Sequence, residues 1–257
     1  MADAIAAAGS PSGGAATLAP ATSPRVYCVP HAGGSAVAFA DLRRALRPEL
    51  EVVFLDPPGH GRRLLEPLAD SVGEVADDLY RILRGVLRPQ DVLLGNSLGS
   101  WIAYELVLRC QQHGTALPRL LVCCASAPPP AAPAANPLFS LPDAEFLAEV
   151  GAFGRLPARV FQDPQLREIY LPILRRDYQL VDEYHHDARP VDCDVLVLRG
   201  TEDELTAPGT GDWLPFAGRT CRVQDFAGGH FFLYEQTRQV ARSLEQHYAH
   251  STRVGLA

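Results

Sequence analysis

The pentapeptide Gly95-Asn-Ser-Leu-Gly99 constrains the fold more than any other stretch of the chain, because of the segments that flank it. The apolar run at 91–94 is typical of a buried strand, and the residues after the pentapeptide, rich in Ile, Ala, Leu and Val, are typical of a helix. A serine at such a strand–turn–helix junction sits on a strained elbow that exposes its hydroxyl. The pattern predicts Ser97 as a nucleophile, although a glycine-rich turn without chemistry shares its composition.

Further apolar runs predict a sheet whose strands alternate with helices. We expect strands at 25–30, 51–56, 91–94, 119–125, 193–198 and 220–226. We expect helices in the stretch ending near 47, at 71–87 after a capping box, at 98–113 and at 231–247. This alternation favours an α/β fold with a mostly parallel central sheet flanked by helices on both faces.

The pattern changes between about 128 and 189, where we expect helices at 143–150 and 164–184 but no strand. A segment of this length is too long for a plain connection, so it predicts a helical lid insertion over one end of the sheet. The Ala/Gly/Ser/Pro-rich residues 1–24 predict a disordered leader, and 25–257 a single domain that contains the lid.

The nucleophile needs a base, because a serine hydroxyl attacks poorly until its proton is removed. In the α/β-hydrolase fold the acid and then the histidine follow the serine along the chain. Asp203 and His230 each follow a predicted strand, at the same sheet edge as Ser97, so we predict a catalytic triad of Ser97, Asp203 and His230. Glu202 and Glu204 remain alternatives for the acid. The other histidines, His60 among them, need only surface or capping roles.

Two backbone N–H groups should stabilise the oxyanion of a tetrahedral intermediate. The N–H of Leu98 lies at the start of the helix behind the elbow, where donors lack partners within the helix. We expect the second donor in the loop 31–34 and choose Ala32, while a purely structural role for its two glycines stays open.

Composition and charge exclude several classes of function. A net charge of −7 without a basic stripe argues against a nucleic-acid partner. No apolar run approaches the roughly 18 residues of a membrane span, and the N-terminus lacks the features of a signal peptide. The six cysteines form no CxxC pair and predict free thiols in the cytosol. With no HExxH motif and no phosphate-binding loop, we expect no metal and no cofactor.

Motifs along most of the chain after Arg25 resemble the type II (external, editing) thioesterases of polyketide synthase and nonribosomal peptide synthetase systems. They are VPHAGGS at 29–35, PPGHGR at 57–62, GNSLG at 95–99, SLPDAEFL at 140–147, LPILRRD at 171–177, GTED at 200–203 and GGHFF at 228–232. The two motifs inside the predicted lid are the most specific, because the triad alone is shared with esterases, lipases and peptidases.

The resemblance implies hydrolysis of acyl groups held as thioesters on the phosphopantetheine arm of an acyl or peptidyl carrier protein. It implies the same triad and the same oxyanion donors, with the acyl chain beneath the lid, and we expect a monomer. The arginines at 62, 63, 155, 159, 167, 175 and 176 are expected either to meet the carrier protein or the phosphate of the arm, or to form a solvated face.

The chain departs from this family on both sides of the nucleophile. The family usually has His before the serine and often has Met after it. Here the residues are Asn96 and Leu98. This difference leaves open a dedicated product-release or ring-closing activity. A small-molecule esterase on the same fold and a catalytically idle docking subunit also stay open.

Overall fold

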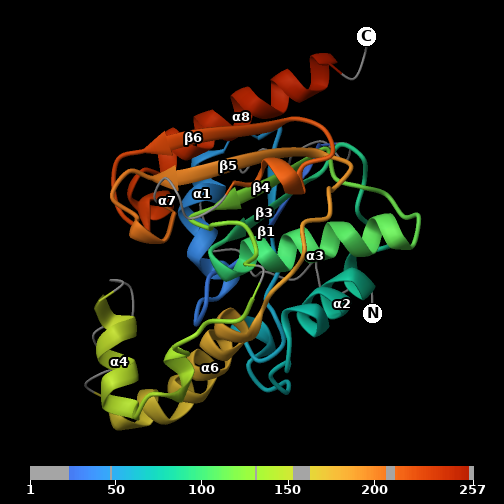
Figure 1. Cartoon of the computed structure of the whole chain (residues 1–257). Helices are drawn as coiled ribbons and strands as arrows, with labels where there is room; N and C mark the ends of the chain where they lie inside the picture. The colour runs from blue at the N-terminus through green and yellow to red at the C-terminus, as the bar shows by residue number, and fades with distance from the viewer. Residues whose placement is uncertain (1–22, 47, 131, 153–162, 207–211, 255–257) are drawn as a thin grey trace, which may run out of the picture.

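The central feature of the computed structural model is one parallel sheet, with strand order β2-β1-β3-β4-β5-β6 (Figure 1). The structure describes residues 23–46, 48–130, 132–152, 163–206 and 212–254. Every strand pairing between these six strands is parallel. The strands are β1 (Arg25–Val29), β2 (Glu51–Phe54), β3 (Val92–Asn96), β4 (Leu120–Cys124), β5 (Asp194–Gly200) and β6 (Cys221–Phe226).

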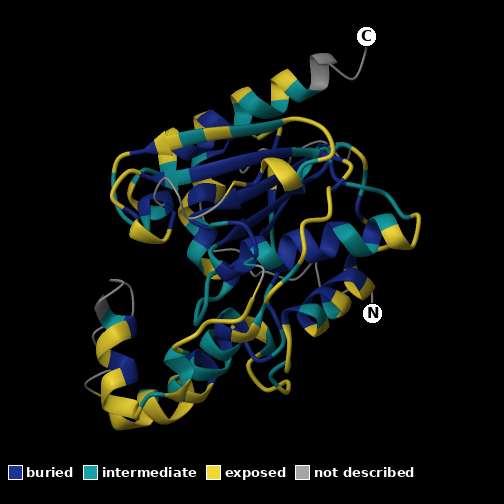
Figure 2. Cartoon of the chain, viewed as in Figure 1, coloured by how far each residue is buried: buried dark blue, intermediate teal, exposed yellow. Residues whose placement is uncertain are grey.

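Helices cover both faces of this sheet, because each strand directs alternate apolar side chains to opposite sides. In β1, Tyr27 and Val29 belong to one core cluster, and Val26 and Cys28 belong to the other. The first core includes side chains of α2 (Val72–Leu83) and α3 (Leu98–Gln112), which pack together. The second lies under α1 (Ala40–Ala45) and α8 (Thr237–Val254). Figure 2 shows the sheet strands as mostly buried.

The expected strands all form, and the helices differ from expectation mainly at their ends. The predicted capping box opens α2, since the Ser71 hydroxyl accepts from Glu74 N–H at 3.1 Å and the Glu74 carboxylate accepts from Asp70 N–H at 2.8 Å. This helix ends at Leu83, before Gly85, rather than near 87. The closing helix expected at 231–247 is two helices, α7 (Phe232–Glu235) and α8, and α8 extends to Val254.

A helical segment separates β4 from β5 and stands apart from the sheet. It contains a 3-10 helix η4 (Leu138–Ser140), α4 (Asp143–Ala152) and α6 (Pro164–Glu183), and no strand among the residues described between 128 and 189. Figure 1 shows α4 far from the sheet, with α6 leading back to the body of the molecule. The segment has its own small core, in which Phe146, Leu147 and Val150 of α4 meet Leu174 of α6.

Some sequence predictions fall outside the described residues. Positions 1–22 of the expected leader, the expected helix end at Arg47, and Arg155 and Arg159 belong to this group. Within the described ranges, no helix is long and apolar enough to cross a membrane.

Candidate active site

Ser97 follows β3 on a sharp turn with φ 53° and ψ −122°, a conformation that side-chain-bearing residues rarely adopt. Backbone crowding enforces the neighbouring glycines. A Cβ atom added at Gly95 would lie 2.1 Å from the Gly99 carbonyl oxygen, and one at Gly99 would lie 2.3 Å from that of Val29. The turn therefore has the strain and close packing expected of a nucleophile elbow.

Asp203 and His230 form a hydrogen-bonded pair at the same edge of the sheet, after β5 and β6. The His230 Nδ1 lies 3.0 Å from Asp203 Oδ2, with side chains only 11% and 2% exposed. The Asp203 carboxylate also accepts from Thr206 Oγ1 at 3.0 Å and from Leu205 N–H at 3.1 Å. Burial opposes ionisation, but the hydrogen bond and charge of His230, with these further donors, hold the pKa of Asp203 below its usual value.

This pairing separates Asp203 from its two rivals, because Glu202 and Glu204 are exposed while Asp203 is buried. An ionised Asp203 accepts the Nδ1 proton of His230 and leaves the Nε2 lone pair available as a base. The structure thus brings two of the three predicted triad members into direct contact.

Ser97 is not hydrogen-bonded to that pair, but side chains of α7 and the residues before it connect the two parts of the site. Between these two described residues, the hydroxyl of Ser97 makes no hydrogen bond to His230. The His230 ring packs against Phe231 at 5.2 Å between centroids, and Phe231 lies 6.1 Å from the ring of Tyr234. The Tyr234 hydroxyl accepts from Nδ2 of Asn96, the neighbour of Ser97, at 3.2 Å. Catalytic hydrogen bonds often form fully only when substrate binds, so the Ser97–His230 bond stays a prediction.

The two predicted oxyanion donors are both unengaged. Among the described residues, no hydrogen bond involves the backbone N–H of Ala32 or of Leu98. Leu98 is the buried first residue of α3, where an N–H without a partner is uncommon unless a ligand uses it. A turn in which Gly34 N–H donates to the His31 carbonyl at 2.9 Å sets the loop that carries Ala32.

The surface role predicted for His60 is wrong, because only 5% of this residue is exposed. His60 does precede the 3-10 helix η3 (Gly61–Arg63) as its N-cap residue, but its side chain makes no capping hydrogen bond. His60 Nε2 lies 2.9 Å from Oδ2 of Asp177 on α6, and its Nδ1 lies 2.9 Å from the carbonyl oxygen of Pro58. Asp177 Oδ2 also accepts from the N–H of Gly33 at 2.6 Å. All three residues lie in motifs noted in the sequence, Gly33 in 29–35, His60 in 57–62 and Asp177 in 171–177, but nothing in those motifs indicated that the three meet.

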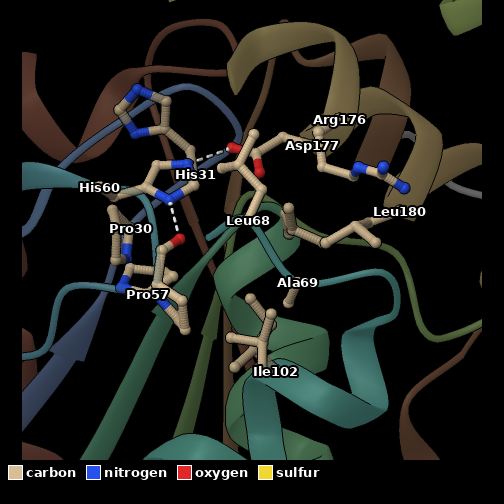
Figure 3. Close-up of a pocket in the computed structure, with 13 residues that line it drawn as sticks. Pro30, His31, Pro57, His60, Leu68, Ala69, Ile102, Arg176, Asp177 and Leu180 are labelled. Carbon is tan, nitrogen blue, oxygen red and sulfur yellow. Dashed lines mark hydrogen bonds and ion pairs between the residues drawn. The ribbon is translucent and has the colours of Figure 1, made fainter. Parts of the chain in front are cut away.

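Figure 3 shows a pocket beside these residues, between the sheet edge and α6. Leu98 lines it, which places the pocket next to one predicted oxyanion donor. Arg176 lies at its α6 side and pairs with Asp70 at 3.0 Å. Most of the remaining lining is apolar: Pro30, Pro57, Pro58, Leu68, Ala69, Val75, Ile102 and Leu180.

Metal-ligand clusters and the state of the cysteines concern two further kinds of site. Among the described residues, no group of three or more His, Cys, Asp or Glu side chains could hold a metal ion. All six cysteines are free thiols, and burial raises the pKa of those for which a shift is resolved, such as Cys193 to about 12.

Comparison with known proteins decides the family, since residues 24–248 match the model of the thioesterase domain. The chain belongs to the thioesterase family. It is therefore a hydrolase that acts on thioesters, with the α/β-hydrolase fold of its structural neighbours.

Individual relatives agree with this assignment. The chain is 30% identical over 232 residues to Thioesterase PikA5 of Streptomyces venezuelae, covering 89% of this chain and 82% of that protein. The crystal structure of ClbQ from the colibactin NRPS/PKS pathway has a TM-score of 0.83 and 30% identity, over 91% of this chain and 100% of that one. The type II thioesterase BorB from the borrelidin biosynthetic cluster has a TM-score of 0.79 and 28% identity, over 90% and 94%. The resemblance to type II thioesterases seen in the sequence is confirmed.

Proposed function

We propose that this thioesterase hydrolyses acyl groups from the phosphopantetheine arm of carrier proteins in polyketide or nonribosomal peptide biosynthesis. The buried Asp203–His230 pair, at the same sheet edge as the Ser97 elbow, carries this proposal. The relatives named for PKS and NRPS pathways support the choice of substrate. Cytosolic location, monomeric state and the single-domain organisation with a disordered leader stay predictions.

In the proposed reaction, His230 Nε2 takes the Ser97 proton while the hydroxyl oxygen attacks the thioester carbonyl. Asp203 holds the imidazole in the required tautomer and stabilises the imidazolium. The carbon–sulfur bond then breaks, and the thiolate of the arm takes the proton from His230. A water molecule, deprotonated by the same imidazole, then attacks the acyl-enzyme. The bond between the acyl carbon and Ser97 Oγ breaks, the imidazolium returns the proton to Oγ, and the acid is released.

The free N–H groups of Ala32 and Leu98 would bind the oxyanion in both steps. The largely apolar pocket beside Leu98 marks where we expect the acyl group to enter. Its free volume in this structure is about 10 Å³, room for about one water molecule, so α6, as part of a lid, has to shift to admit an acyl chain. Hydrocarbon chains gain from leaving water in such a site, by about 25 cal/mol per Å² of apolar surface.

The described arginines differ in how free they are to meet a carrier protein. Arg175 donates to the carbonyl oxygen of Leu141 at 2.8 Å and pairs with Asp143, and its guanidinium lies over the Phe146 ring. These contacts hold the helical segment together. Arg176, at the edge of the pocket, is better placed to meet the phosphate of the arm, because its partner Asp70 is exposed and easily displaced.

The test is hydrolysis of a panel of acylated carrier proteins, followed by mass spectrometry of the carrier. We expect the wild-type protein to release acyl groups, and Ser97→Ala to lose about 10³-fold or more of kcat, as removal of a triad nucleophile does elsewhere. Near-full turnover by Ser97→Ala would refute the triad. Faster turnover of simple oxygen esters than of carrier-bound thioesters would favour the esterase function.

Two rival functions have direct tests. Cyclic rather than hydrolysed products from a peptidyl or polyketide carrier would identify a dedicated release enzyme. A fluorophosphonate probe that leaves Ser97 unlabelled would identify a catalytically idle subunit.

A further inference from the structure

A single carboxylate oxygen on α6 connects three separate segments of the chain. Asp177 Oδ2 accepts from Gly33 N–H in the loop after β1, at 2.6 Å. It also accepts from His60 in the loop after β2, at 2.9 Å (Figure 3). Asp177 is 4% exposed and His60 is 5% exposed. A buried carboxylate is costly unless it is paired and hydrogen-bonded, and here the loop beside the elbow supplies part of that compensation.

The geometry favours a His60 that carries a proton on each ring nitrogen. Nε2 faces the carboxylate of Asp177 and Nδ1 faces the carbonyl oxygen of Pro58, and both of these oxygens are acceptors. A neutral imidazole would turn a lone pair towards one of them. Although burial lowers it, the pKa of His60 is raised on balance by the hydrogen bond and charge of Asp177, with a smaller contribution from Asp56. Arg176 is the nearby cation that also lines this pocket, and it pairs with Asp70.

Packing reinforces the connection between α6 and the loop. Gly33 has φ +71°, and a Cβ atom added there would lie 2.4 Å from a methyl carbon of Leu174. Leu174 precedes Asp177 by one helical turn, so the two side chains lie on the same face of α6. On this face of α6, Leu174 therefore packs on Gly33 and Asp177 accepts the hydrogen bond from the Gly33 N–H.

The same loop orients one proposed oxyanion donor. The His31 carbonyl and the Ala32 N–H belong to one peptide plane, and a trans peptide points them in opposite directions. The carbonyl accepts from Gly34 N–H, which leaves the Ala32 N–H directed away from the turn. Holding Gly33 from outside fixes this turn, because Gly33 is its central glycine and glycine is otherwise conformationally free.

We propose that Asp177 is a positioning residue that, with His60, holds the Ala32 N–H in place, so that the oxyanion hole is complete only while α6 is seated on the loop. The proposal rests on the proposed function, since it assumes that Ala32 and Leu98 bind the oxyanion. Contact of α6 with the loop and completion of the oxyanion hole are then one event.

The experiment compares Asp177→Asn with the matched control Asp182→Asn. Asp182 is also a buried acid of α6, but it accepts from Phe139 N–H at 3.1 Å within the helical segment and, among the described residues, makes no hydrogen bond to the loop at 31–34. Each variant is assayed for kcat and KM with a short acyl-pantetheine thioester. Affinities for an acyl trifluoromethyl ketone, which forms an oxyanion on Ser97, and for the free acid product are measured in parallel.

We expect Asp177→Asn to lower kcat by about 10- to 100-fold with KM little changed, because loss of a whole oxyanion donor costs about 10²- to 10³-fold and this donor is only misplaced. Affinity for the ketone should fall in parallel and affinity for the acid should not. Asp182→Asn should stay within about threefold of wild type in kcat. Equal kcat and ketone affinity in the two variants would overturn the proposal.

Two further measurements keep the result interpretable. Fluorophosphonate labelling of wild-type Ser97 tests the proposed function first, and an unlabelled wild type would refute that function rather than the role of Asp177. If Asp177→Asn does not fold, His60→Gln decides, because it keeps an N–H donor but removes the positive charge. We expect it to lower kcat about three- to tenfold, and an unchanged kcat would overturn the proposal.

Discussion

Replacing Asp203 with Asn would test the triad through the tautomer of His230. The Leu205 N–H donates to Asp203 Oδ1 at 3.1 Å, so an asparagine would keep its carbonyl oxygen there and place its NH₂ group where Oδ2 now meets His230. Because that group donates, the imidazole would turn a lone pair towards it and carry its proton on Nε2. A base protonated at Nε2 cannot accept the proton of Ser97.

The expected loss in kcat is about 10⁴-fold, or about 5 kcal/mol of transition-state stabilisation, which is the size that this change has in a serine protease. The free energy of unfolding should change far less, because asparagine has nearly the same shape as aspartate and keeps hydrogen-bond partners at both ends of its amide group. The assay is steady-state hydrolysis of an acyl-pantetheine thioester, with urea unfolding of the same preparations. Near-wild-type kcat would refute the assignment of the acid.

The exposed neighbours of Asp203 supply the controls. Glu202→Gln and Glu204→Gln should keep kcat within about twofold of wild type, because surface charges in solvent interact weakly. A loss of several orders of magnitude in either variant, with Asp203→Asn active, would move the acid to that residue.

Further predictions concern stability. The folded-state pKa of His60 lies above its unfolded value of about 6.5, so the stability supplied by the pair is complete below about pH 6.5 and is lost as pH rises through the folded-state pKa. Asp177→Asn should therefore lower the free energy of unfolding by about 2 to 4 kcal/mol at about pH 6, and by less at about pH 9, as measured by urea unfolding. An equal loss at both pH values would contradict a charged His60. Gly99→Ala should destabilise the protein by about 3 kcal/mol or more, or prevent folding, because its Cβ would lie 2.3 Å from a backbone atom. Gly85→Ala should not destabilise it, because no atom lies within 4 Å of the added Cβ. Circular dichroism melts compare the two variants, and equal melting temperatures would exclude the steric explanation.

Much of the fold could be predicted because its signals are local. The six apolar runs, the capping box at Ser71 and the glycines around Ser97 each carry a pattern within a few residues. Glu202, Asp203 and Glu204 all follow the same strand, so this position alone could not separate them, and the structure adds the burial that singles out Asp203.

The His60–Asp177 pair could not be predicted in the same way. Its members are 117 positions apart, and nothing in their local sequence requires them to meet. Asp177 follows two arginines in a helix with many charged side chains, a composition typical of a solvated face. Burial of such a residue depends on how α6 packs on two loops, which is a tertiary property that local periodicity does not encode.

The small core of the helical segment has a consequence for how this protein could diversify. Leu174 fills that core together with Phe146 of α4, and it also occupies the space where a side chain at Gly33 would lie. Leu174 therefore packs in two places, the core of the helical segment and the loop after β1. Homologues in which α4 and α6 are repacked to admit bulkier substrates would also disturb the loop near the nucleophile, unless the residue at position 174 stayed the same size. Changes that widen selectivity should therefore accumulate around this leucine rather than at it.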